Sequence, residues 1–308
     1  MKVNWNSEVD DDLRPRPADG LAATFHENTK LAPETARRQA AALTMTPLEK
    51  YLSSRGFRQH PHLPSVPLPP CAPSEARLGE VLRGRRSRRD LSGPLSFPQL
   101  SALVQQALGP TLVYETEPER ITQALRAWPS AGGLYPLDAY VVARRVDGLE
   151  PGVYHYNLAT VALERLPTRG PDELLRDGFF WQEWVTSAAA AILLVAAFER
   201  TLAKYGERGY RLVLLDAGHA AQNVLLVAEQ EQVSACAVAG FCDDALAADL
   251  DLDGVDEAVV HAIILGTPGA SDTPDTPDPP DPADAADAAD APPGTTGTTG
   301  TTGTPGGG

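Results

Sequence analysis

The sequence predicts an α+β fold in which a mixed central sheet is flanked by helices. Strand patterns and helix patterns interleave along residues 75–266 without the strict alternation of a parallel α/β protein. The longest apolar run, residues 188–198, is continuous over 11 residues. A membrane span takes about 20 such residues, so we interpret this run as a central strand that is buried on both faces.

Residues 1–74 are expected to form an N-terminal segment that is only partly helical. Helical patterning appears over residues 33–53, where Pro47 divides it into two shorter helices. Six prolines follow within residues 60–73. They exclude a helix or a central strand, because proline lacks the backbone N–H that both need. We therefore expect an extended linker there.

The densely patterned domain spans residues 75–266. We expect one helix over residues 75–84 and a second that begins at a capping box formed by Ser96 and Gln99. The second helix runs to Leu108, where Gly109-Pro110 ends it. Strands are expected over residues 137–144, 152–157, 161–166, 188–198, 233–238 and 257–265, with 152–157 and 161–166 paired as a hairpin.

A long helix is expected over residues 210–229, apolar on most of its surface. Asp216, His219 and Asn223 share one face of it, because they lie three and four positions apart. A polar stripe on a buried helix has to be hydrogen-bonded internally or across an interface. We interpret this stripe as structural, on a helix that packs at a subunit interface.

The end of the chain, residues 267–308, is expected to be disordered. Aspartate recurs at every third position from Asp272 to Asp290, and Gly-Thr-Thr repeats follow. The tail has no large apolar residue whose burial would offset the entropy of folding. It holds seven acids and no basic residue, so the net charge of −15 becomes −8 for residues 1–266. This acidity argues against nucleic acid or an anionic membrane surface as the main partner.

Cysteine and histidine usage indicates neither a disulfide framework nor a metal site. Three cysteines, at positions 71, 236 and 242, are too few and too scattered for a disulfide framework. Neither Cys-x-x-Cys nor His-x-x-x-His spacing occurs, so we predict no metal. The first residues lack the apolar core of a signal peptide, and we expect a cytoplasmic protein.

Two segments carry the residue types of an anion-and-ring site. Arg85-Arg86-Ser87-Arg88-Arg89 places four guanidinium groups around a hydroxyl, and guanidinium groups bind phosphate through paired, charge-assisted hydrogen bonds. Pro129-Ser130-Ala131-Gly132-Gly133 is a loop whose glycines allow the backbone to approach a flat ligand closely. Taken alone, the arginines could simply favour a helix C-terminus, and the loop could be a simple turn.

Taken together and in this order, the two segments resemble the flavin-binding segments of the nitroreductase-like family. The resemblance is stronger to its SagB-type branch, the FMN-dependent azoline dehydrogenases of peptide natural-product pathways. Further matching segments are Gly152-Val153-Tyr154-His155-Tyr156, Lys204-Tyr205 and Gly218-His219-Ala220-Ala221-Gln222-Asn223. The resemblance covers roughly residues 75–266 and implies a nitroreductase-like fold whose long central helix lies at a homodimer interface.

The resemblance also implies which residues bind FMN. In the first segment, the residues implied to contact the phosphate, the ribityl chain and the pyrimidine edge of the ring are Arg85, Arg86, Ser87 and Arg89. Arg88 occupies a variable position and receives no role. In the second segment, the residues implied to lie along the flavin ring are Pro129, Ser130, Ala131 and Gly132. The N–H of Gly240 is implied to face the ring's N5 and O4 edge.

One departure from the family concerns the phosphate. Many nitroreductases place a basic residue on the phosphate after the last strand, whereas Leu265-Gly266-Thr267-Pro268 leads directly into the acidic tail. Phosphate binding would therefore rest on the Arg85–Arg89 segment.

The implied reaction is oxidation of thiazoline or oxazoline rings to thiazole or oxazole in a ribosomally made, modified peptide. Lys204 is implied as the base and Tyr205 as a residue that orients the substrate or assists proton transfer, in a stretch expected to be a loop. An ordinary surface loop with ion pairs is the alternative for this pair. The implied partners are the azoline-containing peptide, a cyclodehydratase and a second copy of the chain. Alternative functions are a general NAD(P)H-dependent nitroreductase and a non-catalytic scaffold subunit of a peptide-modifying complex.

Overall fold

The computed structural model describes residues 20–33, 58–71, 74–116, 121–180 and 182–269. Apart from its first residue, the helical stretch expected over residues 33–53 lies outside these ranges, as does the tail from residue 270. Among the described residues, no helix is both long and apolar enough to cross a membrane.

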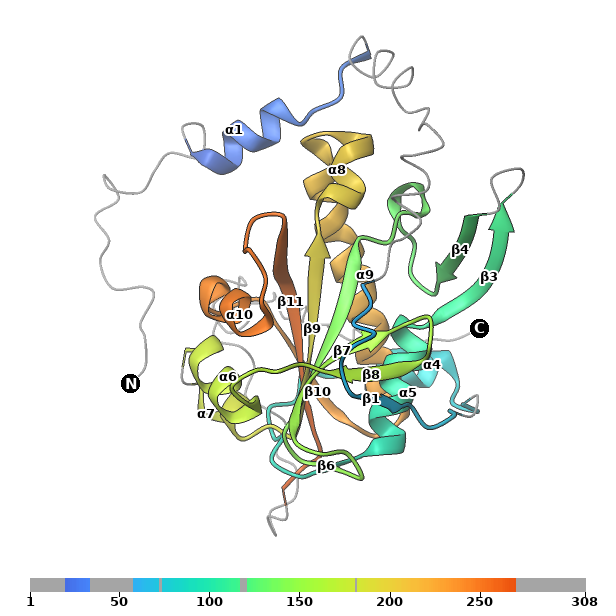
Figure 1. Ribbon diagram of the computed structural model, residues 1–308, viewed down its shortest axis with the longest axis vertical. Helices are drawn as coiled ribbons and strands as arrows, with labels where there is room; N and C mark the ends of the chain where they lie inside the picture. Colours follow the sequence, from blue (N-terminus) through green and yellow to red (C-terminus); the bar gives the residue numbers. More distant parts are fainter. Residues whose placement is uncertain (1–19, 34–57, 72–73, 117–120, 181, 270–308) are drawn as a thin grey trace, which may run out of the picture. The chain divides into compact units, whose positions relative to one another are not determined.

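A seven-stranded sheet forms the centre of the fold (Figure 1). Its strands in spatial order are β1 (Ser65–Pro67), β8 (Ala162–Arg165), β7 (Gly152–Asn157), β5 (Leu137–Ala143), β9 (Ala190–Ala197), β11 (Glu257–Gly266) and β10 (Ser234–Val238). Every neighbouring pair in this sheet is antiparallel. The α+β prediction is confirmed, but a mixed central sheet was the wrong expectation. A parallel pairing occurs outside it, between β2 (Leu95–Ser96) and β6 (Val146–Asp147).

Strand β9 lies in the interior of the sheet, as its continuous apolar sequence predicts. All of its residues are buried. Ile192 and Leu194 belong to the core on one face of the sheet, whereas Leu193 and Val195 belong to the core on the other face. The strand reads as a continuous apolar run because both of its faces are covered by apolar side chains.

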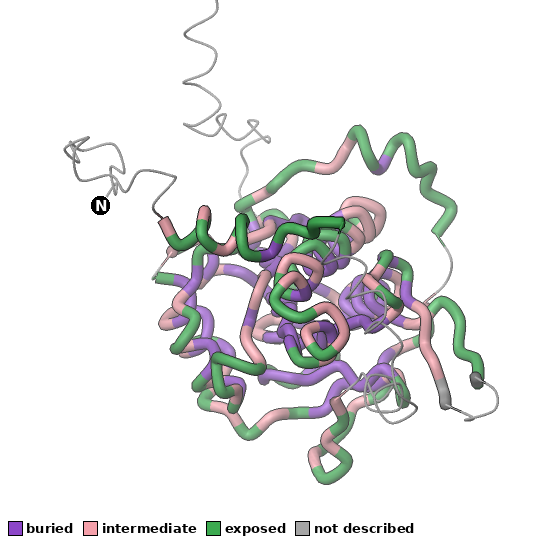
Figure 2. Tube along the Cα trace, turned by 90° about the horizontal axis from the view of Figure 1, so that it is seen from above, coloured by how far each residue is buried: buried purple, intermediate pink, exposed green. Residues whose placement is uncertain are grey.

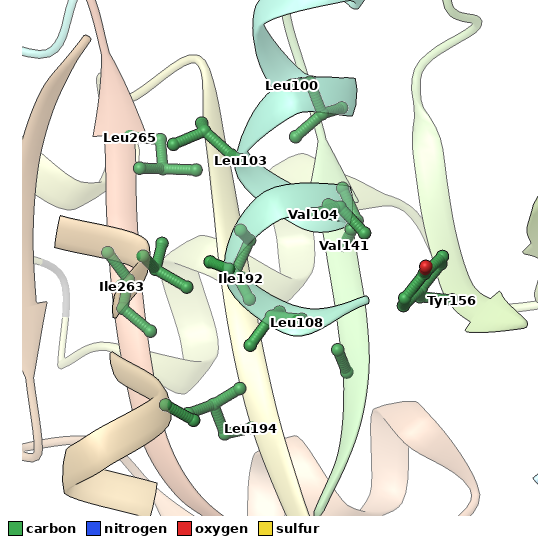
Figure 3. Packing of buried hydrophobic residues seen from close by; sticks show 14 of the residues in the cluster. Leu100, Leu103, Val104, Leu108, Val141, Tyr156, Ile192, Leu194, Ile263 and Leu265 are labelled. Atoms are coloured by element: carbon green, nitrogen blue, oxygen red, sulfur yellow. The ribbon is translucent and has the colours of Figure 1, made fainter. Parts of the chain in front are cut away.

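One face of the sheet is covered by α5 (Phe97–Leu108) and α9 (Arg208–Gln230), with α4 (Leu78–Gly84) packed against α9. The predicted capping box is present in α5: the Gln99 N–H donates to Ser96 Oγ at 3.3 Å, and the Ser96 N–H donates to Gln99 Oε1 at 3.0 Å. Figure 3 shows Leu103, Val104 and Leu108 of this helix facing the strand residues Ile192 and Val141.

The opposite face is covered by three helices that the sequence patterns did not predict: α6 (Pro171–Gly178), α7 (Glu183–Thr186) and α10 (Asp243–Leu250). In Figure 2 the buried parts of the chain trace, drawn in purple, lie mainly inside segments that are half-buried or exposed. Also not predicted were α1 (Leu21–Asn28), α8 (Glu199–Tyr205), the short 3₁₀ turn η2 (Ala131–Gly133) and an outlying hairpin of β3 (Pro110–Thr116) and β4 (Ile121–Arg126).

Part of the proline-rich segment belongs to the central sheet, where the sequence predicted only a linker. Its residues Ser65–Pro67 form β1, which pairs with β8 at the edge of the central sheet. Proline is tolerated in an edge strand because one side of the strand needs no hydrogen-bond donor. The sheet therefore begins before the domain boundary that the sequence patterns predicted at residue 75.

Candidate functional site

Lys204 and Tyr205 lie at the end of α8 rather than in a loop, which corrects the expectation for this stretch. Burial of Thr201 and partial burial of Leu202 give the segment an inward face. The helix ends at Gly206, whose φ of +55° is a backbone conformation that favours glycine. The chain then turns directly into α9.

The end of α8 meets the predicted Pro-Ser-Ala-Gly-Gly loop at Gly132. A methyl group added at Gly132 would lie 2.7 Å from Tyr205 Oη and 2.9 Å from Lys204 Nζ. Gly132 also has a φ of +65°. Lys204 Nζ lies 5.4 Å from the centre of the Tyr205 ring. The structure therefore brings the predicted catalytic pair and the second predicted ligand-binding segment together around one glycine.

Asp216 of α9 holds this loop in place through hydrogen bonds. It is buried, and its carboxylate accepts hydrogen bonds from the Ser130 hydroxyl and the Ala131 N–H. The Ser130 hydroxyl oxygen in turn accepts from the Tyr135 N–H at 2.9 Å. The second oxygen of Asp216, Oδ2, has no partner among the described residues. The Ser130 side chain thus faces the protein, and the loop can offer mainly its backbone and glycines to a ligand.

The same carboxylate affects the chemistry of Tyr205. Burial raises the pKa of Asp216, although its hydrogen bonds act in the opposite direction. Burial also raises the pKa of Tyr205, and the Asp216 charge raises it further. Tyr205 is therefore held in its protonated form, as a hydrogen-bond donor at the end of α8.

Helix α8 is anchored to the sheet by a buried ion pair that sequence reasoning missed. Arg200 Nη2 lies 2.7 Å from Oδ2 of Asp138 on β5. Asp138 is also close to the buried Arg126, which lies 5.3 Å from the centres of both the Trp128 and Tyr135 rings. Burial lowers the pKa of Arg126 to about 10. A charged residue in an otherwise apolar strand, Asp138 in β5, is the one signal in the sequence that marks this network.

The arginine segment lies elsewhere on the chain, after α4 and along β10. The Arg88 N–H donates to the carbonyl of Ala235 at 3.0 Å, and Arg88 Nη1 lies 2.9 Å from Oε2 of Glu229 on α9. Arg88, for which the sequence predicted no ligand, is thus occupied in a structural ion pair.

The other predicted residues of this segment are available to a ligand. Arg85, Arg86 and Arg89 form no ion pair within the described part of the chain. Arg86 donates to the carbonyls of Arg83 and Arg85, and the Arg89 guanidinium carbon lies 5.7 Å from the centre of the Trp184 ring. Ser87 is exposed. Three cations without acidic partners and one exposed hydroxyl fit a phosphate group.

Gly240 and the arginine segment both lie next to helix α7. Gln182, which precedes α7, donates from Nε2 to the Gly240 carbonyl at 3.5 Å, and Trp184 of α7 faces Arg89. Gly240 is exposed, and a methyl group added there would meet nothing within 4 Å. The backbone at Gly240 is therefore open to a flat ligand.

The predicted residues thus form two groups on one chain. The first comprises Arg85–Arg89 and Gly240, and the second comprises Pro129–Gly132 with Lys204 and Tyr205. The first group is tied to α9 at Glu229 and the second at Asp216. These two positions are 13 residues apart on α9, which at 1.5 Å per residue separates the anchor points by about 20 Å along the helix axis.

Comparison with known proteins identifies the family of residues 82–267. The model of the nitroreductase family matches residues 82–267, more than half of the chain. The candidate nitroreductase MJ1384 of Methanocaldococcus jannaschii is 35% identical over 171 residues, which cover 55% of this chain and 82% of that protein. A crystal structure of a candidate nitroreductase from Anabaena variabilis has a TM-score of 0.64 at 27% identity, and the match covers 83% of this chain and 52% of that one.

Two further relatives are named for the processing of another molecule. The microcin B17-processing protein McbC of Escherichia coli is 29% identical over 172 residues, 54% of this chain and 63% of McbC. The trifolitoxin-processing protein TfxB of Rhizobium leguminosarum is 31% identical over 109 residues, 34% of this chain and 29% of TfxB. The chain thus spans less than two thirds of both of these proteins.

Proposed function

The chain belongs to the nitroreductase family, and from this premise we propose that it is an FMN-dependent dehydrogenase that oxidises azoline rings in a modified peptide. The observation that carries the proposal is the meeting of Lys204 and Tyr205 with Gly132. An amine and a phenol lie directly beside the loop that would support a flat cofactor. The peptide-processing relatives McbC and TfxB support a peptide as the substrate.

The residues present fit FMN. Arg85, Arg86, Ser87 and Arg89 would hold the phosphate end, because these three arginines lack acidic partners within the described part of the chain. The open backbone at Gly240 and the loop Pro129–Gly132 would lie against the ring. Bound FMN supplies the hydride acceptor for the two-electron oxidation, chemistry that no side chain provides.

We propose that each FMN is held between two copies of the chain. The two groups of binding residues are anchored about 20 Å apart on α9 by the helix rise, which is a long span for one small cofactor. The outer face of α9 exposes Leu214 and Leu215, which are 42% and 58% accessible. A second copy packed on this face would bring its own loop Pro129–Gly132 toward the arginine segment of the first. This pairing accounts for the exposed apolar residues of α9 as well.

Lys204 is proposed as the base that removes the proton from the ring carbon next to the peptide carbonyl, where the developing negative charge is delocalised. The neighbouring ring carbon loses a hydride, so the azoline gives up one proton and one hydride and becomes an aromatic azole. Tyr205, kept protonated by burial and by Asp216, is positioned to donate a hydrogen bond to the substrate. Asp138 and Arg200 hold α8, and with it the pair, against the sheet.

The proposal is tested with Lys204→Ala in the FMN-loaded protein and an azoline-containing peptide. We expect FMN to stay bound while ring oxidation, followed as a loss of two hydrogens by mass spectrometry, falls by about 10²–10⁴-fold, the usual contribution of a general base. Glu199→Ala, an exposed change on the same helix, serves as the control and should retain activity. Oxidation at the wild-type rate by Lys204→Ala would reject Lys204 as the base.

A general nitroreductase is the second candidate, because MJ1384 is 35% identical to this chain. That function predicts rapid reduction of the bound FMN by NAD(P)H, visible as bleaching of the flavin absorbance, and no change in azoline peptides. A protein that binds no FMN would favour the third candidate, a scaffold subunit beside a cyclodehydratase. One absorbance spectrum of the purified protein separates this candidate from the two enzymes.

A further inference from the structure

A cluster of metal-ligating side chains lies apart from the residues of the proposed FMN site, on strands β7 and β8 beside the edge strand β1. His155 comes from β7, Glu164 from β8, and His60 from the segment that leads to β1. Each of the three offers one nitrogen or oxygen atom, and these atoms all lie within 4.8 Å of one another. His155 and Glu164 are buried and His60 is half-buried.

Hydrogen bonds hold the cluster in place. Glu164 Oε2 lies 2.9 Å from His155 Nδ1 and accepts from the His60 N–H at 2.9 Å. Its other oxygen, Oε1, accepts from Asn157 Nδ2 at 2.6 Å. The two imidazole rings are T-shaped, with centroids 5.1 Å apart. One carboxylate therefore contacts the ring of His155 and the backbone of His60, and it holds these two residues next to each other.

His60 has coordinating capacity that the protein leaves unused. Its Nε2 is buried and lacks any hydrogen-bond partner among the described residues, and such an atom is costly to leave unsatisfied. On His155, Nδ1 faces Oε2 of Glu164 at 2.9 Å, so an ion bound between these two atoms would take the place of their hydrogen bond.

Glu164 also lacks a cationic partner. It forms no ion pair with a lysine or an arginine within the described ranges, and a buried carboxylate is stabilised by a cation placed beside it.

The cluster is also accessible. His60 lines a cavity of about 710 Å³ between residues 58–63, residues 166–169 and the end of α10. None of the residues predicted for the FMN site lines this cavity. An ion can therefore approach the cluster from the side of His60, and the cavity leaves room for a water molecule beside it.

We propose that His60, His155 and Glu164 bind one divalent zinc ion, which connects the segment before β1 to the β7–β8 hairpin. Two imidazoles and a carboxylate form a ligand set that suits zinc, with one position left for solvent. The sequence predicted no metal because the three ligands lie at positions 60, 155 and 164, and no local spacing marks them. The site is independent of the proposed FMN chemistry.

The test uses the full chain with its bound FMN, prepared with an affinity tag that contains no histidine. After chelator treatment, equilibrium dialysis against zinc chloride is followed by elemental analysis, with FMN measured by absorbance on the same samples. We expect one zinc ion per wild-type chain and a loss of affinity of at least about tenfold in His60→Ala and Glu164→Gln. The matched control is His62→Ala, an exposed histidine on the wall of the same cavity, which should bind zinc like the wild type.

A wild-type chain that takes up no zinc would overturn the proposal, and so would equal binding by the wild type, His60→Ala and Glu164→Gln. Because Glu164→Gln removes a buried charge, its folding is checked by circular dichroism. Should it fail to fold, Co²⁺ substitution of the wild type decides: d–d absorption of tetrahedral Co²⁺ that zinc displaces supports the site, and its absence rejects it. FMN content is expected to be the same in every sample, so loss of zinc and failure of the FMN proposal are distinguishable.

Discussion

At the scale of single residues, Gly132 determines whether the proposed site can form. Its φ of +65° favours glycine, and the place of its missing side chain is taken by Lys204 Nζ and Tyr205 Oη. Gly133 next to it has almost the same φ, +66°, but nothing lies within 4 Å of the place a side chain would occupy. Comparing the same substitution at the two glycines therefore distinguishes the effect of backbone strain from the effect of side-chain contact.

Gly132→Ala and Gly133→Ala should each lose about 1–2 kcal/mol of stability, the cost of a left-handed conformation for a residue with a Cβ. Only Gly132→Ala should also push Lys204 and Tyr205 out of position and lower azoline oxidation by at least about tenfold, since small displacements of reacting groups are costly. Urea unfolding and peptide turnover measured on both variants check this. Equal activity in the two variants would show that the contact at Gly132 is unimportant.

Asp216 provides a second expectation, which concerns stability as a function of pH. Because burial raises its pKa above the ordinary value of 3.8, the folded chain holds a proton there more tightly than the unfolded chain does. The stability this proton contributes is present below pH 3.8 and is lost as pH rises through the raised pKa. The asparagine side chain of the Asp216→Asn variant does not titrate, so the stability of this variant lacks this contribution at every pH.

The free energy of unfolding of the wild type, relative to that of Asp216→Asn, should therefore fall as pH rises from 3.8 and level off above the raised pKa. Urea titrations of both proteins at a series of pH values measure this difference. Asp244→Asn, an exposed change on α10, is the control and should not reproduce the curve. A difference that grows with pH would mean that the hydrogen bonds from Ser130 and Ala131 outweigh burial.

At the scale of elements, the sequence predicted those parts whose patterns are local. The hairpin β7–β8, the interior strand β9 and the long helix α9 lie within a few residues of their predicted bounds, because apolar periodicity and continuity are strong over these stretches. The start of α5 was predicted because a capping box is a local signal.

The elements that were missed depend on tertiary contacts. Helix α8 is short, and its inward face becomes visible only through the packing of Thr201 and through the Arg200–Asp138 ion pair. Strand β1 contains Pro67 and follows Pro64, which both argue against a strand, and it forms because it pairs with β8. Apart from the hairpin of 152–157 and 161–166, the strand patterns gave no pairing directions, so the sheet was wrongly expected to be mixed.

At the scale of the whole molecule, the proposed site needs a second copy of the chain, and the outer face of α9 is where that copy would bind. Leu215→Glu places a charge on this face at a residue that is 58% accessible. We expect a monomer that has lost FMN, because burying a leucine contributes about 1.5–3 kcal/mol and a buried unpaired charge opposes association. Analytical ultracentrifugation with flavin absorbance detects both effects.

Val255→Glu is the matched control, since Val255 is 76% accessible and lies outside α9, in the segment just before β11. It should leave the mass and the FMN content unchanged. A Leu215→Glu variant that remains dimeric with full FMN would place the contact between copies elsewhere.

The sequence predicted which residue types and which segments belong to the candidate site, but it did not predict how these segments are arranged in space. The sequence suggested that Arg85–Arg89 and Pro129–Gly132 form two halves of one site, because the two motifs follow each other in the order that the family has. Motif order does not say how far apart the two segments lie in the fold. Their anchoring to α9 at Glu229 and Asp216 is a property of the fold. Asp216 was interpreted as structural, and its contact with the Ser130 hydroxyl appears only once the loop and the helix are brought together.

The prolines at the edge of the sheet have a consequence for how copies of this protein can meet. Strand β1 ends the sheet on one side. Pro64 and Leu68 bond toward β8, so Pro67 between them faces outward and offers no N–H to a further strand. A short edge strand of this kind is a poor template for another strand, which disfavours edge-to-edge pairing of copies at this border.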